Sequence, residues 1–168
     1  MTLSMYQASA PVFVRQLEAL SAILKKAEAF AEAKKIDSTV LVNDRLAPDM
    51  LPLSKQIQIA TDGVKGCVAR LADMEIPSYA DTETTIAQLQ ERVAKTIAFI
   101  KTVPADKVDG TEDKDIVLKL RDTEMPFKGQ AYLLNFVMPN FFFHVTMAYA
   151  ILRHNGVEIG KRDFLGAA

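Results

Sequence analysis

A long stretch without any charged side chain constrains this sequence more than any other feature. From Gly129 to Leu152 the chain holds no Asp, Glu, Lys or Arg. Asn155 is followed by Gly156, a typical left-handed stop for a helix. The pattern therefore predicts a helix over Gly129–Asn155, roughly 40 Å long at ~1.5 Å per residue. Such a run either crosses a bilayer or forms the centre of a soluble helical bundle.

Polar residues inside this stretch favour the bundle over the membrane. Asn135, Pro139, Asn140 and His144 lie near its middle, where polar side chains would be costly at bilayer depth. The other predicted helices are amphipathic and need an apolar partner. We therefore expect no membrane association, and we expect this helix to be buried among the others.

Three further helices and a hairpin complete the expected fold. The helices are predicted where apolar residues recur at helical spacing, over Leu3–Lys35, over Pro48–Met74, and from a cap at Asp81 or Thr82 to Pro104. Strands are predicted over Ile116–Leu120 and Thr123–Phe127, joined by a turn at Arg121-Asp122. The pattern predicts an all-α, up-and-down four-helix bundle with a small β-hairpin before the last helix, in a single domain over residues 1–168.

Charge and cysteine content exclude several classes of function. The net charge is −1, and the pair Lys161–Arg162 is the one basic candidate for phosphate contacts, so nucleic-acid binding is not expected. The N-terminus lacks a basic segment before an apolar core, so no signal peptide is expected. The single Cys67 excludes an internal disulfide and is typical of a reducing cytoplasm. P-loop, Rossmann, HExxH and CxxC patterns are absent, which leaves open whether the protein is an enzyme.

Asn140 and His144 are the strongest candidates for a site. They lie four residues apart and share one face of the most apolar helix. Pro139 has no N–H, so the carbonyl of Asn135 loses its helical partner and a kink is expected. One interpretation is a buried pair that satisfies its own polar atoms, and the other is the lining of a pocket. A structural role is also expected for Cys67.

The second helix offers partners for this polar face. Asp49 and Gln56 are seven residues apart and share a face, so we expect Asn140 and His144 to point towards one of them in a partly buried site. Tyr149 is a further candidate for ligand contact. No metal site is expected within the last helix, because His144 and His154 are roughly 15 Å apart along its axis.

The string MPNFFFHVTMAYAILRHNGVEIGKRDFLG, with RLAPDMLPLSKQI and the pair IVLKL and EMPFKG, resembles a known group. It is similar to an uncharacterised bacterial family within the DinB/YfiT-like metalloenzyme superfamily. The resemblance covers nearly the whole chain. It implies a four-helix bundle with a small hairpin before the last helix, often as a homodimer.

The resemblance also implies where a metal would be held. Metal-binding members of that superfamily use three His, one from the second helix and two that lie four residues apart on the last. His144 matches one of the last pair, but its partner position is Ala148, and Pro48–Met74 contains no His. Asp49 or Gln56 would have to substitute. We therefore expect no metal and no other cofactor.

Three functions remain open from the sequence. The first is small-molecule binding in a site that has lost its metal, lined by His144, Asn140, Asp49, Gln56 and Tyr149. The second is a metal-dependent thiol transferase or hydrolase, with His144 and Asp49 as ligands and a water as nucleophile. The third is a purely structural role as a homodimer.

Overall fold

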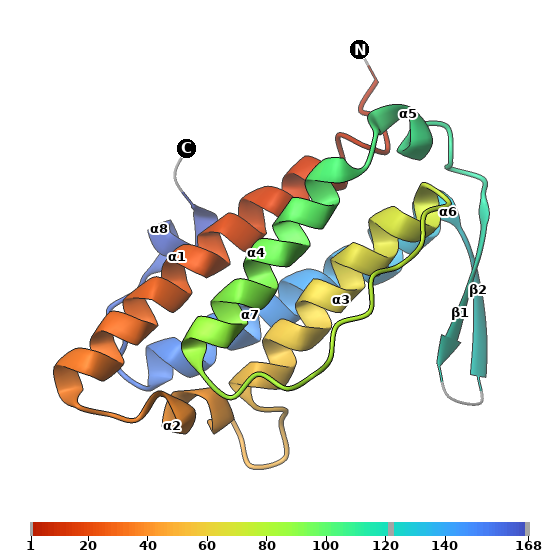
Figure 1. Ribbon diagram of the computed structural model, residues 1–168. Helices are drawn as coiled ribbons and strands as arrows, with labels where there is room; N and C mark the ends of the chain where they lie inside the picture. Colours follow the sequence, from red (N-terminus) through yellow and green to blue (C-terminus); the bar gives the residue numbers. More distant parts are fainter. Residues whose placement is uncertain (1, 121–122, 167–168) are drawn as a thin grey trace.

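The computed structural model describes residues 2–120 and 123–166. Four long helices lie side by side along the molecule: α1 (Ala10–Lys34), α3 (Leu53–Leu71), α4 (Ile86–Thr102) and α7 (Met138–His154) (Figure 1). The shorter elements are α2 (Ser38–Asn43), α5 (Ala105–Val108), β1 (Asp115–Leu120), β2 (Thr123–Lys128), α6 (Gly129–Ala131), the π-helix η1 (Tyr132–Val137) and α8 (Lys161–Leu165). The prediction of a mostly helical chain with a small hairpin before the last helix is confirmed.

The long helices pack in two main pairs around a continuous apolar core. The most extensive contacts join α3 to α7 and α1 to α4, and α3 also packs against α4. Phe13 of α1 and Phe141 of α7 meet edge to face at 5.3 Å in the fully buried centre. The tail after α7 returns along α1, where Gln16 Nε2 donates a hydrogen bond to the carbonyl of Phe164.

The first two predicted helices begin later than expected. The first starts at Ala10 instead of Leu3, after a turn in which Ser9 Oγ donates to the carbonyl of Met5. The second starts at Leu53 instead of Pro48, because the residue before a proline disfavours helical backbone and Pro52 therefore delays the start. Residues 44–52 form a loop instead, which removes Asp49 from the helix on which the prediction placed it.

The third helix also begins later than the sequence pattern suggested. Its cap is Thr85, whose side chain accepts from the Gln88 N–H while Gln88 reaches back to the backbone at Thr85. This reciprocal capping box satisfies two amide groups at once, which a single cap at Asp81 or Thr82 would not do. Residues 72–85 instead run as an extended segment along the bundle (Figure 1).

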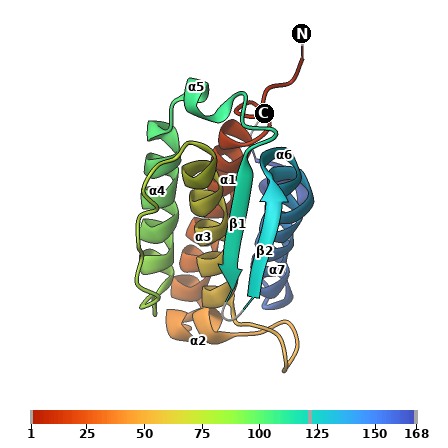
Figure 2. The same ribbon diagram turned by 90° about the vertical axis from the view of Figure 1, so that its right-hand side faces the viewer.

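The hairpin lies against one side of the helices, beside the C-terminal end of α3 (Figure 2). Its strands pair antiparallel from Asp115 opposite Lys128, with Val117 opposite Pro126. Phe127 of the hairpin packs against Phe136 of η1, with the two ring centroids 5.3 Å apart. The predicted turn at Arg121-Asp122 lies outside the described residues.

The last predicted helix is continuous from Gly129 to His154, and a π-helical segment precedes the proline at which the sequence indicated a kink. Three elements, α6, η1 and α7, follow one another from Gly129 to His154. In η1 the Met138 N–H donates to the carbonyl of Leu133, five residues earlier. The wide turns end just before Pro139, whose missing N–H could not have supported regular α-helical bonding to Asn135.

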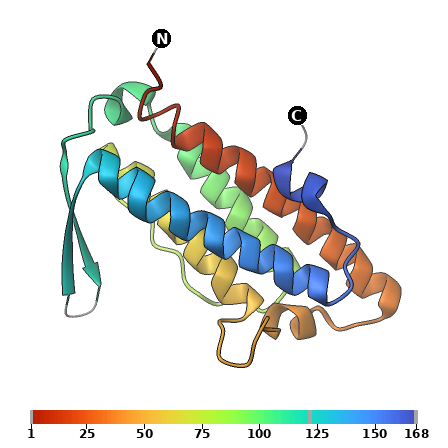
Figure 3. The same ribbon diagram turned by 180° about the vertical axis from the view of Figure 1, so that it is seen from behind.

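The expectation that Gly129–Leu152 is buried among the other helices is wrong for its outer side. The helix α7 packs against α3 and, less extensively, α1, so the side turned away from both faces solvent (Figure 3). Leu134 is 43% exposed and Phe143 is 53% exposed. Among the described residues, no helix combines the length and apolar character that crossing a bilayer requires.

Candidate functional site

The contact between α3 and α7 brings His144 and Gln56 together. The Nδ1 atom of His144 lies 2.7 Å from Oε1 of Gln56, and both side chains are buried, with 8% and 2% of their surface exposed. The amide of Gln56 is oriented by its own Nε2, which donates to the carbonyl of Leu51 at 3.0 Å. The oxygen of Gln56 therefore faces the imidazole.

This orientation assigns the proton on the His144 ring. Since Gln56 Oε1 can only accept, Nδ1 carries the hydrogen and donates it, and Nε2 keeps its lone pair. Burial lowers the pKa of His144 below its ordinary value of 6.5, which keeps the ring neutral at pH 7. Among the described residues Nε2 has no hydrogen-bond partner, yet it is not one of the polar atoms sealed from solvent. The site therefore presents a hydrogen-bond acceptor.

Phe143 lies beside the His144 ring, and Asn140 lies one helical turn before it on α7. Asn140 approaches α3 where Gly63 leaves room, with its Nδ2 atom 3.7 Å from the position of a Cβ on that glycine. The exposed ring of Phe143 stands edge-on to the His144 ring, with centroids 5.3 Å apart. The surface around His144 thus combines one ring nitrogen, one amide and one aromatic ring.

Two predicted site residues are not brought to His144. Asp49 is exposed in the loop before α3, and the hydrogen bonds of the described residues do not join it to the imidazole. Tyr149 packs edge-on against Phe164 of α8, with ring centroids 5.8 Å apart. Five residues along a helix turn the side chain by roughly 140°, so Tyr149 and His144 point in different directions.

The residues around His144 do not fit the three-ligand metal site that the superfamily implies. The partner position on α7 is Ala148, which is fully buried, and Gln56 already accepts from Nδ1. The thiol of Cys67 is fully buried, which raises its pKa and disfavours the thiolate. In residues 2–120 and 123–166, no group of three or more His, Cys, Asp or Glu could hold an ion together.

Five surface hollows in the described part of the chain are lined by residues other than the predicted site residues. The largest of the five, about 500 Å³, lies between the C-terminal end of α3 and β1. None of these five hollows therefore includes His144.

A cluster of charges around one buried arginine was missed by the sequence reasoning. Arg92 of α4 is fully buried, and its guanidinium lies 2.9 Å from Asp62, 3.1 Å from Asp81 and 3.0 Å from Glu83. Its Nε also donates to Thr61 Oγ1 at 2.9 Å. Burial alone would raise the pKa of Glu83, but hydrogen bonds from Arg92 and Gln58 outweigh it and lower that pKa. These ion pairs link the 72–85 segment to α3 and α4.

One signal in the sequence could have found this cluster. Arg92 lies between Leu89 and Val93 in the apolar stripe of its helix, where a charged side chain is buried only if it is paired. Its partners come from two separate segments, however, α3 and residues 72–85, and spacing alone does not identify them.

Comparisons with known proteins agree with the resemblance seen in the sequence. The model of the family described as a domain of unknown function, DUF1993, matches residues 5–165. A crystal structure of a DinB family member protein from Shewanella denitrificans is 39% identical, covers 97% of this chain and 92% of that chain, and superposes with a TM-score of 0.86. No curated protein matches the chain.

Proposed function

Since this chain belongs to the DUF1993 family of DinB-like proteins, we propose that it binds a small molecule at His144 without a metal ion. The observation that carries the proposal is the hydrogen bond from His144 Nδ1 to Gln56 Oε1. It uses one ring nitrogen internally and leaves Nε2 as an outward acceptor. Gln56 lies on α3, the second long helix, from which the superfamily resemblance implies one metal ligand.

The chemistry of the site selects a class of ligand. A neutral imidazole with a free Nε2 accepts from a hydroxyl, an amide N–H or an ammonium group. The Asn140 amide can both donate and accept, and the exposed Phe143 ring offers an apolar contact. We therefore expect a small ligand with a hydrogen-bond donor and an apolar part.

The metal-dependent transferase or hydrolase is the alternative function. The free lone pair on Nε2 favours it, since this is the atom with which an imidazole binds a metal. One such atom does not make a tight site, because a metal needs several deprotonated ligands that converge. Asp49, the second ligand required by this alternative, lies on the exposed loop.

Family membership also supports a finer description of the fold. We propose that α1, α3, α4 and α7 form an up-and-down four-helix bundle of the DinB/YfiT type, within one domain over residues 1–168. A cytoplasmic location is part of the same proposal, because the buried Cys67 thiol is compatible with a reducing compartment.

A homodimer is proposed on the outer side of η1 and α7. This face exposes Leu134 and Phe143 and lies within a stretch free of charged residues, so a charged partner would find no counter-charges there. A second copy of the same face supplies the matching apolar surface. Light scattering should give twice the chain mass for the native protein and the chain mass for Leu134→Glu. A monomeric native protein would contradict the dimer, and with it the purely structural role as a homodimer.

Ligand screening combined with metal analysis tests the proposed function. Compounds with hydroxyl, amide or amine groups are screened for an increase in melting temperature on the native protein, on His144→Asn and on His154→Gln. The increase should appear in the native protein and in His154→Gln, whose histidine is exposed, and disappear in His144→Asn. Stoichiometric zinc or nickel that survives dialysis and is lost in His144→Ala would overturn the metal-free proposal in favour of the alternative.

A further inference from the structure

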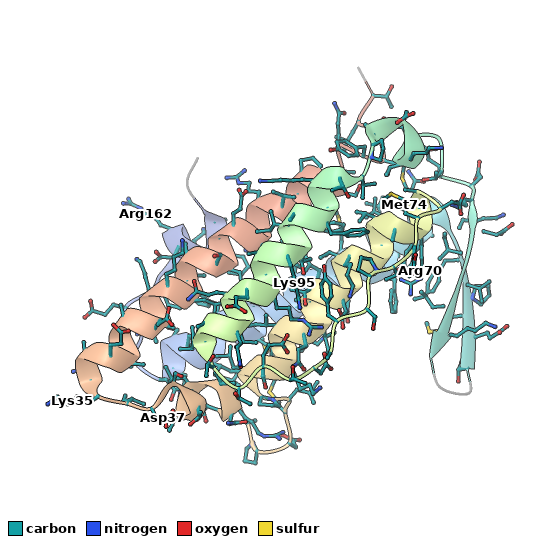
Figure 4. All side chains as sticks on the ribbon, in the orientation of Figure 1. Lys35, Asp37, Arg70, Met74, Lys95 and Arg162 are labelled. Carbon is teal, nitrogen blue, oxygen red and sulfur yellow. The ribbon has the colours of Figure 1, made fainter. Side chains whose placement is uncertain are left out.

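The hollow between α3 and β1 contains a guanidinium that lacks a counter-ion in the described part of the chain. Arg70 lines this hollow of about 500 Å³ together with Met74, Glu75, Ile116 and Val117, among others. Arg70 and Met74 both lie near the C-terminal end of α3 (Figure 4). Carboxylates of the described residues do not lie within ion-pair distance of Arg70. We propose that this hollow binds a small amino-acid-like molecule, whose carboxylate is held by Arg70. The site is separate from His144, and the inference does not rest on the proposed function.

The Arg70 guanidinium is held in place before any ligand arrives. Its Nη1 donates to the Tyr132 hydroxyl at 3.0 Å. A Cβ on Gly66, one turn earlier on α3, would overlap Nη1 and lie 3.4 Å from Cζ, so the guanidinium folds back over that glycine. A side chain ordered in this way loses less entropy when it binds an anion.

Tyr132 orients Arg70 without cancelling its charge. Burial raises the pKa of Tyr132 to about 12, so the phenol is neutral at pH 7. The guanidinium donors that do not contact Tyr132 remain available, and a planar fork of N–H groups matches a carboxylate with two parallel hydrogen bonds.

The other charges of the hollow decide which kind of anion fits. The Lys114 ammonium donates to the carbonyls of Arg70 and Leu71, 2.8 Å each, and pairs with Asp73 at 2.7 Å. Asp115 pairs with Lys128 at 2.7 Å. Glu75 is exposed, and the lysines and arginines of the described residues do not pair with it.

One cation and one carboxylate are thus left for a ligand, on Arg70 and Glu75. A phosphate dianion would be repelled by Glu75, whereas a molecule with a carboxylate and an ammonium group complements both. Met74, Ile116 and Val117 add an apolar wall for its side chain. These features together indicate an apolar amino acid rather than a phosphate.

Titration calorimetry with four probes tests this site. L-leucine carries both charged groups, 4-methylpentanoate only the carboxylate, 3-methylbutylamine only the ammonium, and inorganic phosphate is a multivalent anion. L-leucine should bind most tightly, 4-methylpentanoate more weakly, and the amine and phosphate should show no saturable binding. Absence of L-leucine binding, or tighter binding of phosphate, would overturn the proposal.

Substitutions locate the binding within the hollow. Arg70→Gln should weaken L-leucine binding by about tenfold or more, as expected for the loss of a charge-assisted pair. Glu75→Gln should reduce the preference for L-leucine over 4-methylpentanoate. Arg153→Gln, on the exposed last turn of α7, is the matched control and should change neither.

Two further variants test whether a change in L-leucine binding results from unfolding or from the His144 site. Tyr132→Phe keeps the aromatic ring but releases Arg70, and should weaken L-leucine binding while the far-ultraviolet circular dichroism stays native. His144→Asn should leave L-leucine binding unchanged. Binding that is retained in Arg70→Gln, or lost in His144→Asn, would contradict the assignment to this hollow.

Discussion

The imidazole of His144 donates from Nδ1 to the side-chain oxygen of Gln56, 2.7 Å away, across the contact between α7 and α3. Both side chains are buried, so either one without the other would leave a buried polar group without its hydrogen-bond partner. The pair ties the most apolar helix of the chain to a polar position on its neighbour, and the consequences can be measured.

Replacing Gln56 by Leu should destabilise the protein. The substitution leaves the Nδ1–H of His144 buried without an acceptor, which costs about 1–3 kcal/mol. Urea unfolding of the native protein and the variant measures the difference. The resonances of the His144 ring in NMR spectra report on the hydrogen bond itself. Gln58→Leu, on the same helix, is the control for these resonances, because it removes a hydrogen bond to Glu83 and not one to His144. An unchanged His144 resonance in Gln56→Leu would contradict the hydrogen bond.

The lowered pKa of His144 predicts a dependence of stability on pH. The unfolded chain takes up a proton near the ordinary value of 6.5, while the folded protein does so only at lower pH. The unfolded state therefore binds more protons in this window, and stability falls as the pH drops below about 6.5. The free energy of unfolding, measured by urea titration between neutral and mildly acidic pH, should show this fall.

Two variants assign that pH dependence to one ring. His144→Asn should flatten the curve in the same window, and His154→Gln, which changes an exposed histidine, should leave the slope as it is. An equal slope in His144→Asn and the native protein would show that other groups are responsible.

The buried Arg92 is expected to control the 72–85 segment. The Glu83 side chain is only 7% exposed, and Arg92→Met removes the cation with which it pairs. Removal of one partner from a buried ion pair is strongly destabilising. Asp62 and Asp81 are partly solvated, so we expect a loss of about 3 kcal/mol, at the lower end for buried pairs. Hydrogen exchange should accelerate in residues 76–85 before it does in α1. The control is Lys101→Met, which breaks an exposed pair with Glu18 and should have little effect.

The long helices could be predicted because their signal is local. Apolar residues such as Leu89 and Val93 recur at helical spacing within one segment, and the structure buries them. The helix starts were missed because the capping box at Thr85 and the delay at Pro52 depend on single residues rather than on periodicity. The outer position of α7 was missed because an apolar sequence indicates that a helix packs against others, but it does not indicate how many helices surround it.

The candidate site was predictable only in part for a related reason. A polar face on an apolar helix pointed to Asn140 and His144, and a search of the facing helix pointed to Gln56. The alternative partner, Asp49, depended on where that helix begins, and the observed start at Leu53 leaves it on a loop. The Arg92 cluster and the Arg70 hollow join segments far apart in the sequence, so no spacing rule reveals them.

Gly129 should tolerate no side chain, although it begins a helical segment. Replacing a helical glycine by alanine ordinarily stabilises by up to ~1 kcal/mol. Here a Cβ would overlap the carbonyl oxygen of Thr111 and stand 3.1 Å from its carbon, and backbone atoms cannot turn aside as a flexible side chain can. We therefore expect Gly129→Ala to destabilise by about 1–3 kcal/mol, as overpacking does. Gly63→Ala is the matched control, because its Cβ would make an ordinary contact at 3.7 Å with Asn140. Urea unfolding compares the two, and a Gly129→Ala protein as stable as Gly63→Ala would show that the hairpin and the segment before it move apart without cost.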